Sequence, residues 1–177
     1  MRTPGASSAG SSGSAVSNVT LEPWEREWAG HVGLMRHQAN AGKRDAAYYR
    51  PELMEDNLRA SIASACAEMA VAKRLNKYWD GSFWTAEQHS HYADRPDVGS
   101  NTEVRRTRKH GGPLVVRRRD VERERVMVLA YPIPDDWMVV DVIGWAMAVD
   151  VWDQGRPASY DEAGTTRLVG QECLNPL

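Results

Sequence analysis

The feature that most constrains the fold is the run of residues 52–77, which combines a helical repeat of apolar side chains with a high density of alanine. The apolar positions recur at steps of three and four residues, as on one face of an α-helix. They are Leu58, Ile62, Ala65, Met69 and Ala72. Alanine is small, so such a helix can approach a sheet or another helix closely. The run therefore predicts a long helix packed against the rest of the domain.

Glu68 lies in the middle of this predicted helix, one turn from Ala65 and from Ala72. That side of the helix is mostly small and apolar. We therefore expect the carboxylate of Glu68 either to lie at the edge of the buried face or to point toward a charged group.

A second helix is expected over residues 20–45, where Trp24 and Trp28 belong to an apolar stripe at helical spacing. We expect this stripe to lie in the core. The tryptophans that flank the end of the 52–77 helix, Trp79 and Trp84, are better candidates for exposed aromatic side chains.

The second half of the chain contains strand signals rather than helical repeats. Strands are expected at 83–86, 102–108, 114–117, 125–131 and 137–142, with 143–146 bending or continuing the last one and a short apolar segment at 166–169. The turn signal at 111–113 predicts a hairpin between 102–108 and 114–117. Run 125–131 is almost continuously apolar, which is typical of a central strand. This order predicts an α+β (mixed α/β) fold, with a central mixed, mostly antiparallel sheet flanked by helices.

Residues 1–18 are mostly Gly, Ser and Ala and are expected to form a disordered tail, leaving 19–177 as a single domain. The chain has two cysteines and no CxxC pair, which favours a reducing compartment. No apolar stretch is suited to spanning a membrane, and the N-terminus has no secretion signal. We therefore expect a cytoplasmic protein with no membrane partner.

Two carboxylates are expected to converge near position 100. Side chains alternate along a strand, so Glu103 and Arg105 share one face of the predicted strand 102–108. Asp97 precedes this strand, and Gly99 permits the bend that would fold Asp97 back toward Glu103. Converging carboxylates repel each other and are stable together only if a proton or a cation lies between them.

The cation that suits this pair is a hard one, since no cysteine or histidine stands at liganding spacing beside the two carboxylates. Oxygen ligands favour Mg²⁺ or Mn²⁺. Such an ion keeps positions for water and a phosphate and helps to form a hydroxide-like nucleophile. The positive charge of the Arg105 side chain would stabilise the negative charge that grows in the transition state.

The segment Pro96-Asp97 followed by Glu103-Val104-Arg105 resembles the motif of the PD-(D/E)XK nuclease superfamily: a P-D pair, a variable gap, then acid–any–lysine on a strand. The segment 67–72 around Glu68 resembles the helix ahead of the sheet, which often carries a further glutamate in that superfamily. The stretch from Glu68 to about Trp145, under half the chain, is similar to small phage-type nucleases with D-V-G, E-V-R and a later G-W. The resemblance implies a restriction-endonuclease-like fold.

The same resemblance implies a Mg²⁺-dependent nuclease that hydrolyses DNA, in a bacterial or phage-infected cytoplasm. Asp97 and Glu103 would bind the metal, Glu68 would complete the ligand set or orient the water, and Arg105 would stand where the lysine usually is. Arginine cannot give up its proton in a protein, so Arg105 can copy the lysine's charge but not a proton exchange. The alternative is a protein that keeps the fold and binds DNA or a protein partner without cutting, with Arg105 neutralising both carboxylates. Whether the chain forms a homodimer is left open.

Basic side chains cluster around the motif. Residues 103–125 hold nine of the 22 Lys and Arg residues, although the net charge of the chain is −2. One interpretation is a solvated charged face, and the other is a ribbon that follows a phosphate backbone. The candidate DNA-binding residues are Arg106, Arg108, Lys109, Arg117, Arg118 and Arg119.

Overall fold

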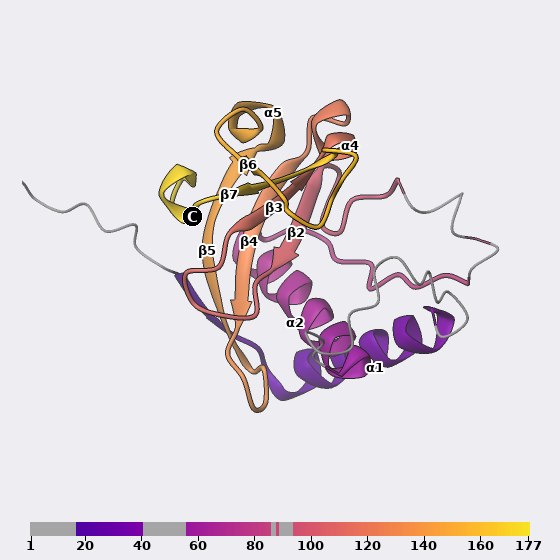
Figure 1. The fold of residues 1–177 in the computed structure, drawn as a ribbon. Coiled ribbons are helices and arrows are strands. Elements are labelled where there is room, and N and C mark those ends of the chain that lie inside the picture. Colours follow the sequence, from indigo (N-terminus) through magenta and orange to yellow (C-terminus); the bar gives the residue numbers. More distant parts are fainter. Residues whose placement is uncertain (1–16, 41–55, 86–87, 89–93) are drawn as a thin grey trace, which may run out of the picture.

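The computed structural model describes residues 17–40, 56–85, 88 and 94–177 and has an α+β fold (Figure 1). Its elements are, in chain order, β1 (Ser17–Thr20), α1 (Pro23–Asn40), α2 (Asn57–Leu75), β2 (Thr102–Arg106), β3 (Leu114–Arg117), α4 (Arg118–Glu122), β4 (Val126–Pro132), β5 (Val139–Met147), α5 (Ala148–Val151), β6 (Arg156–Pro157), β7 (Thr166–Val169) and the 3₁₀ turn η3 (Gln171–Cys173). In the part of the chain that the structure describes, no helix combines the length and the apolar character needed to cross a bilayer.

Helix α2 forms where the alanine-rich repeat predicts a helix. At its start, the carboxylate of Asp56 accepts a hydrogen bond from the backbone N–H of Leu58 at 2.9 Å. At its end, Asn76 adopts the left-handed conformation with φ of 50°. The alanine face is buried against β2, β4 and β5. The predicted helix is therefore confirmed over Asn57–Leu75, and residues 52–55 lie outside the described residues.

Helix α1 packs on α2, and the expectation that its tryptophans are core residues is wrong. Trp24 is 65 % exposed and Trp28 is 48 % exposed, whereas Val32 is fully buried. The reason lies at Gly33, where a Cβ atom would come within 2.5 Å of the Cα of Ile62. The two helices meet through this glycine and other small residues, so the large indole rings stay on the outer side.

The start of the domain also differs from the expectation. Residues 17 and 18, which the sequence assigns to the tail, belong to β1 and pair antiparallel with β5. The first helix begins at Pro23 rather than at residue 20. Residues 1–16 and 41–55 lie outside the described residues.

The strands form two sheets. The four-stranded sheet has the order β1-β5-β4-β2, and the three-stranded sheet has the order β3-β7-β6. Pairing is antiparallel throughout, except that β2 and β4 run parallel. This confirms a mixed and mostly antiparallel arrangement, but in two sheets instead of one. Residues 143–146 continue β5.

The predicted hairpin between β2 and β3 is wrong, because the two strands belong to different sheets. The run Val126–Pro132 is apolar on both faces, so as β4 it takes an inner place between β2 and β5. Strand β3 instead crosses the face of this sheet, where Leu114 and Val116 are fully buried, and pairs with β7. Residues 83–85, predicted as part of a strand, have no regular secondary structure.

The four-stranded sheet lies between helix α2 and the three-stranded sheet (Figure 1), and a hydrophobic core fills the space on each of its faces. On the helix face, Val104 and Val128 pack among the alanines of α2. On the opposite face, Met127 and Leu129 pack against the three-stranded sheet and α5. Strand β2 is an edge strand of this sheet, so among the described residues its outer backbone groups are free of a neighbouring strand and can bind other parts of the chain.

Candidate active site at the edge of the four-stranded sheet

A tight return of the chain places Asp97 beside strand β2. Val98 and Thr102 form an antiparallel bridge, with N···O distances of 3.0 and 3.2 Å. The turn between them contains Gly99 at φ of +59°, a conformation that glycine adopts without steric cost. Asp97 Oδ2 then accepts a hydrogen bond from the backbone N–H of Val104 at 2.8 Å. The structure therefore has the fold-back that the sequence predicts.

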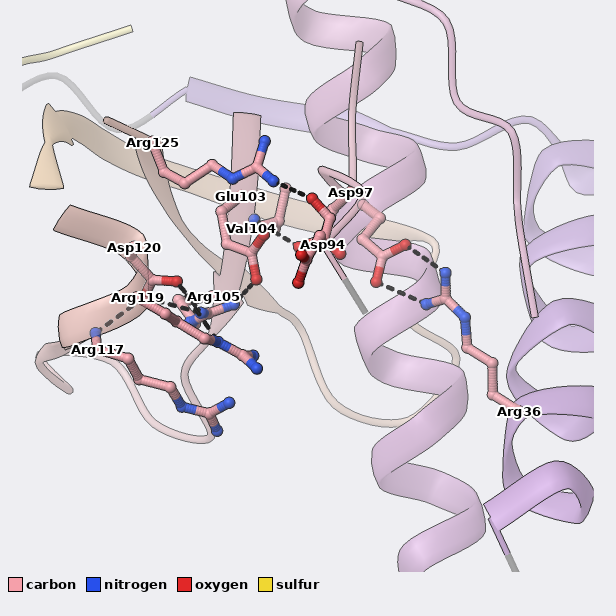
Figure 2. Close-up of polar contacts among 11 residues, drawn as sticks. Arg36, Asp94, Asp97, Glu103, Val104, Arg105, Arg117, Arg119, Asp120 and Arg125 are labelled. Carbon is pink, nitrogen blue, oxygen red and sulfur yellow. Dashed lines mark hydrogen bonds and ion pairs between the residues drawn. The ribbon is translucent and has the colours of Figure 1, made fainter. Parts of the chain in front are cut away.

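The segment before Asp97 is held by two arginines of the α4–β4 connection, Arg123 and Arg125, and Figure 2 shows the contact of Arg125 with Asp94. Arg123 forms an ion pair with the carboxylate of Asp94. Arg125, which is 7 % exposed, donates a hydrogen bond to the backbone carbonyl of the same residue. These contacts fix the approach of the chain to Asp97 from outside the sheet.

Glu103 and Arg105 point to the face of the sheet that is covered by the three-stranded sheet. Their register partners Met127 and Leu129 are buried on that face. Arg105 Nη1 forms an ion pair with Glu103, and Arg105 Nη2 lies 3.0 Å from Oδ2 of Asp120. Arg105 is thus a bridge between two carboxylates rather than a partner of one.

Asp120 is 2 % exposed and is held from several sides. Besides Arg105, it accepts a hydrogen bond from the backbone N–H of Arg117 at 2.8 Å. The guanidinium of Arg119 lies 4.0 Å away. Asp120 therefore locks the position of the Arg105 guanidinium, whose Nε atom is buried without a partner among the described residues.

Glu68 is on helix α2, on the helix-covered side of strand β2. Its two carboxylate oxygens accept hydrogen bonds from Arg36 of α1 at 2.6 and 2.9 Å. Trp79 Nε1 donates a third hydrogen bond at 2.9 Å. Glu68 is 6 % exposed, and the expectation that it points at a charged group is confirmed. Trp79, expected to be exposed, is 9 % exposed, because this hydrogen bond places its ring in the core.

The electrostatics show that the three acidic groups act on one another at Asp97. The pKa of Asp97 lies well above its ordinary value, because removal from water and the negative charges of Glu68 and Glu103 disfavour the ionised form. The hydrogen bond from Val104 and the charge of Arg105 oppose this rise without cancelling it. Figure 2 shows Asp97 between strand β2, which carries Glu103, and Arg36 of helix α1.

The fit of a divalent cation to this site depends on which carboxylates are available. Among the described residues, no group of three or more His, Cys, Asp or Glu side chains is arranged to hold a metal ion. Glu68 is already bound by Arg36 and Trp79. The remaining pair, Asp97 and Glu103, supplies oxygen donors of the kind that Mg²⁺ prefers, and a cation there would relieve the repulsion at Asp97.

The candidate DNA-binding residues lie in two places. Arg106 ends β2 and is half-buried, and Arg108 and Lys109 are exposed on the loop that follows. Arg117, Arg118 and Arg119 lie where β3 passes into α4, next to Asp120. Burial and the charges of Arg105 and Arg119 lower the pKa of Arg117, so this second group is close to the carboxylate site.

Sequence reasoning missed three residues of this site: Arg36, Trp79 and Asp120. Asp120 had a detectable signal, since it is the acid that directly follows the basic run 117–119. Arg36 had none, because its contact with Glu68 depends on how α1 packs on α2, and Trp79 had none, because its contact depends on the path of the chain after α2.

Comparisons of the chain with protein-family models, with curated proteins and with solved structures found no match.

Proposed function

We propose that this chain is a Mg²⁺-dependent nuclease that hydrolyses DNA phosphodiester bonds with a PD-(D/E)XK-type site. The observation that carries the proposal is that Asp97 is bound to the backbone of edge strand β2, near enough for the charge of Glu103 to raise its pKa, while Arg105 is paired with Glu103. A helix with a central glutamate ahead of strands β2 to β5 supports the proposal of a restriction-endonuclease-like fold.

In this proposal Asp97 and Glu103 hold the metal ion. A bound Mg²⁺ would polarise the phosphoryl oxygen and lower the pKa of a coordinated water. The hydrogen bond from Val104 keeps one oxygen of Asp97 in place and directs the carboxylate toward the edge of the sheet. Glu68 is held by Arg36 on the other side of Asp97, so in this proposal it acts on Asp97 through its charge.

Arg105 supplies fixed positive charge. Because Asp120 anchors one side of its guanidinium, Arg105 needs little reorganisation when negative charge develops on a phosphate next to Glu103. Arginine in place of lysine suits this purpose, since a guanidinium stays charged and can contact two carboxylates at once. The proposal therefore assigns Arg105 to charge stabilisation.

A second candidate is a DNA-binding or partner-binding protein that does not cut. One observation favours it: the ion pairs Arg36–Glu68 and Glu103–Arg105–Asp120 already compensate three of the four acids. In that case the carboxylates are structural, and only Asp97 lacks a cation of its own among these contacts.

Labelled DNA substrates separate the two candidates. Wild-type protein is incubated with duplex, single-stranded and junction DNA, with Mn²⁺ or Mg²⁺ or with EDTA. We expect metal-dependent cleavage, reduced by at least about 100-fold in Asp97→Asn and in Glu103→Gln, the scale on which loss of one electrostatic stabiliser acts. Both variants should retain DNA binding.

The matched control is Asp153→Asn, which removes an exposed carboxylate outside the site. It should cleave like wild type. Cleavage that persists in Asp97→Asn and Glu103→Gln would exclude this site, and DNA binding without cleavage by wild type would favour the second candidate.

A further inference from the structure

A cavity of about 520 Å³ opens beside the candidate active site, at the point where β3 passes into α4. Its lining includes Arg117, Arg118 and Arg119, the acid Glu122, and Tyr160, Thr165 and Thr166. This volume lies within the range of pockets that bind small organic ligands. A larger cavity of about 900 Å³ lies against α1 and α2, and it contains none of the site carboxylates.

The positive charge of this cavity is concentrated next to the carboxylate site. Burial, followed by the charges of Arg105 and Arg119, lowers the pKa of Arg117, which shows that these guanidinium groups repel one another. In Figure 2, Arg117 and Arg119 lie on the same side as Arg105 and Asp120. An anion between Arg117 and Arg119 would relieve this repulsion.

Arg118 has a different environment, and its contacts fix the position of the cavity lining. Its guanidinium lies 3.6 Å from Glu122 and over the ring of Trp152, 5.8 Å from the centroid. Its backbone N–H donates to the carbonyl of Thr165 at 2.7 Å. Arg117 and Arg119 are therefore the better placed of the three cations to bind a phosphate.

Tyr160 gives the cavity an aromatic surface. It is 50 % exposed, although the loop that carries it is well braced. Thr165 donates its hydroxyl to Asp161 Oδ2 at 2.9 Å, and Ala158 N–H donates to the carbonyl of Thr166 at 3.2 Å. A large, half-exposed ring on a fixed loop is suited to stacking with a nucleobase.

We propose that this cavity binds one unpaired nucleotide of a DNA strand next to the cleaved phosphodiester, with Arg117 and Arg119 on its phosphate and Tyr160 against its base. The proposal rests on the proposed nuclease function for the identity of the strand. In a duplex the base faces are covered by their neighbours, so a cavity with an aromatic wall suits a single strand or a frayed end. The substrate class is therefore DNA with unpaired nucleotides.

Binding in EDTA tests this without any cleavage. Fluorescence anisotropy compares a labelled thymidine oligonucleotide, its duplex, and an oligonucleotide of the same length with abasic spacers. We expect tighter binding of the single strand than of the duplex. Tyr160→Ala should weaken binding of the thymidine strand about 5- to 150-fold, the effect of one stacked base, and leave the abasic strand unchanged.

The arginines are tested by Arg117→Gln with Arg119→Gln, which should weaken binding of both oligonucleotides and flatten the salt dependence. Two control variants should bind like wild type: Arg74→Gln, on the exposed side of α2, and Trp24→Ala, an exposed aromatic on α1. Equal affinity for duplex and single strand, or an unchanged Tyr160→Ala, would overturn the nucleotide pocket.

Cleavage assays keep the two proposals apart. If single strands bind through Tyr160 but wild type with Mn²⁺ cuts no substrate, the nuclease function fails and the nucleotide pocket stands. If wild type cuts and Tyr160→Ala cuts single strands with the same kcat/KM, the pocket fails and the nuclease function stands.

Discussion

The two carboxylates on either side of strand β2 have very different surroundings. Glu68, under the helices, accepts hydrogen bonds from both ends of the Arg36 guanidinium and from Trp79. Asp97, at the edge of the sheet, has the backbone N–H of Val104 as a partner and is exposed to the charges of two other acids. One acid is fully compensated, and the other is destabilised in its ionised form.

The difference indicates which part of the site is built for stability and which for chemistry. A buried carboxylate with a bidentate arginine is held in one position and needs nothing further. A carboxylate whose pKa is raised by its acidic neighbours is a candidate functional group, because a cation would complete it. On this argument Glu68 is structural, and Asp97 and Glu103 remain the proposed metal-binding residues.

The largest expected effect is on the helix side. Arg36→Met leaves Glu68 buried with Trp79 as its one remaining partner among the described residues, so we expect a loss of about 3–5 kcal/mol in the free energy of unfolding. Thermal unfolding followed by circular dichroism measures it, with Arg74→Met as the control. An unchanged Tm would mean that the Arg36–Glu68 pair does not support the fold, and the contrast between the two carboxylates would break down.

The second-largest effect is expected at Arg105, on both stability and cleavage. Arg105→Met leaves Glu103 and Asp120 without their shared cation, so we expect lower stability and loss of cleavage. Arg105→Lys keeps the charge but cannot contact both acids in the same way, so we expect cleavage to fall only about tenfold. Single-turnover rates measure this. Equal rates for Arg105→Met and wild type would exclude charge stabilisation at this position.

A smaller effect of opposite sign is expected at Asp97. Its raised pKa means that the folded protein keeps the proton at pH values where the unfolded chain has lost it. Its contribution to stability therefore falls as pH rises from about 4 to the raised pKa, and stays low above it. Without metal at pH 7, Asp97→Asn should be more stable than wild type, by roughly 2–4 °C in Tm per kcal/mol removed.

The pH dependence checks the sign of this effect. In EDTA, the Tm difference between Asp97→Asn and wild type should grow as pH rises, whereas Asp153→Asn should show no such trend. A variant less stable than wild type at pH 7 would mean that ionised Asp97 is already compensated.

Local patterns in the sequence predicted the elements that are decided locally. The alanine repeat of α2 and the apolar runs of β4 and β5 are confirmed, as is the turn at Gly99 that brings Asp97 to Val104. In these cases periodicity or backbone preference is sufficient. The position of Glu103 and Arg105 on one face follows from strand alternation alone.

The features that the sequence could not predict depend on long-range packing. Pairing of β2 with β4 instead of β3 is decided by which strand can be buried on both faces. The outward position of Trp24 depends on the close contact of Gly33 with Ile62. The role of Asp120 as anchor of Arg105 requires β3 to cross the sheet, which no local pattern shows.

The most direct test of the central claim, that Asp97 and Glu103 together hold a divalent ion, is thermal unfolding of wild type and Asp97→Asn with and without Mn²⁺ or Mg²⁺. At about 100 times Kd a bound ion stabilises the fold by about 2.7 kcal/mol, or roughly 5–10 °C for a chain of this size. We predict this rise in wild type and its loss in Asp97→Asn. The same Tm with and without metal in wild type, or an equal rise in both proteins, would contradict the claim.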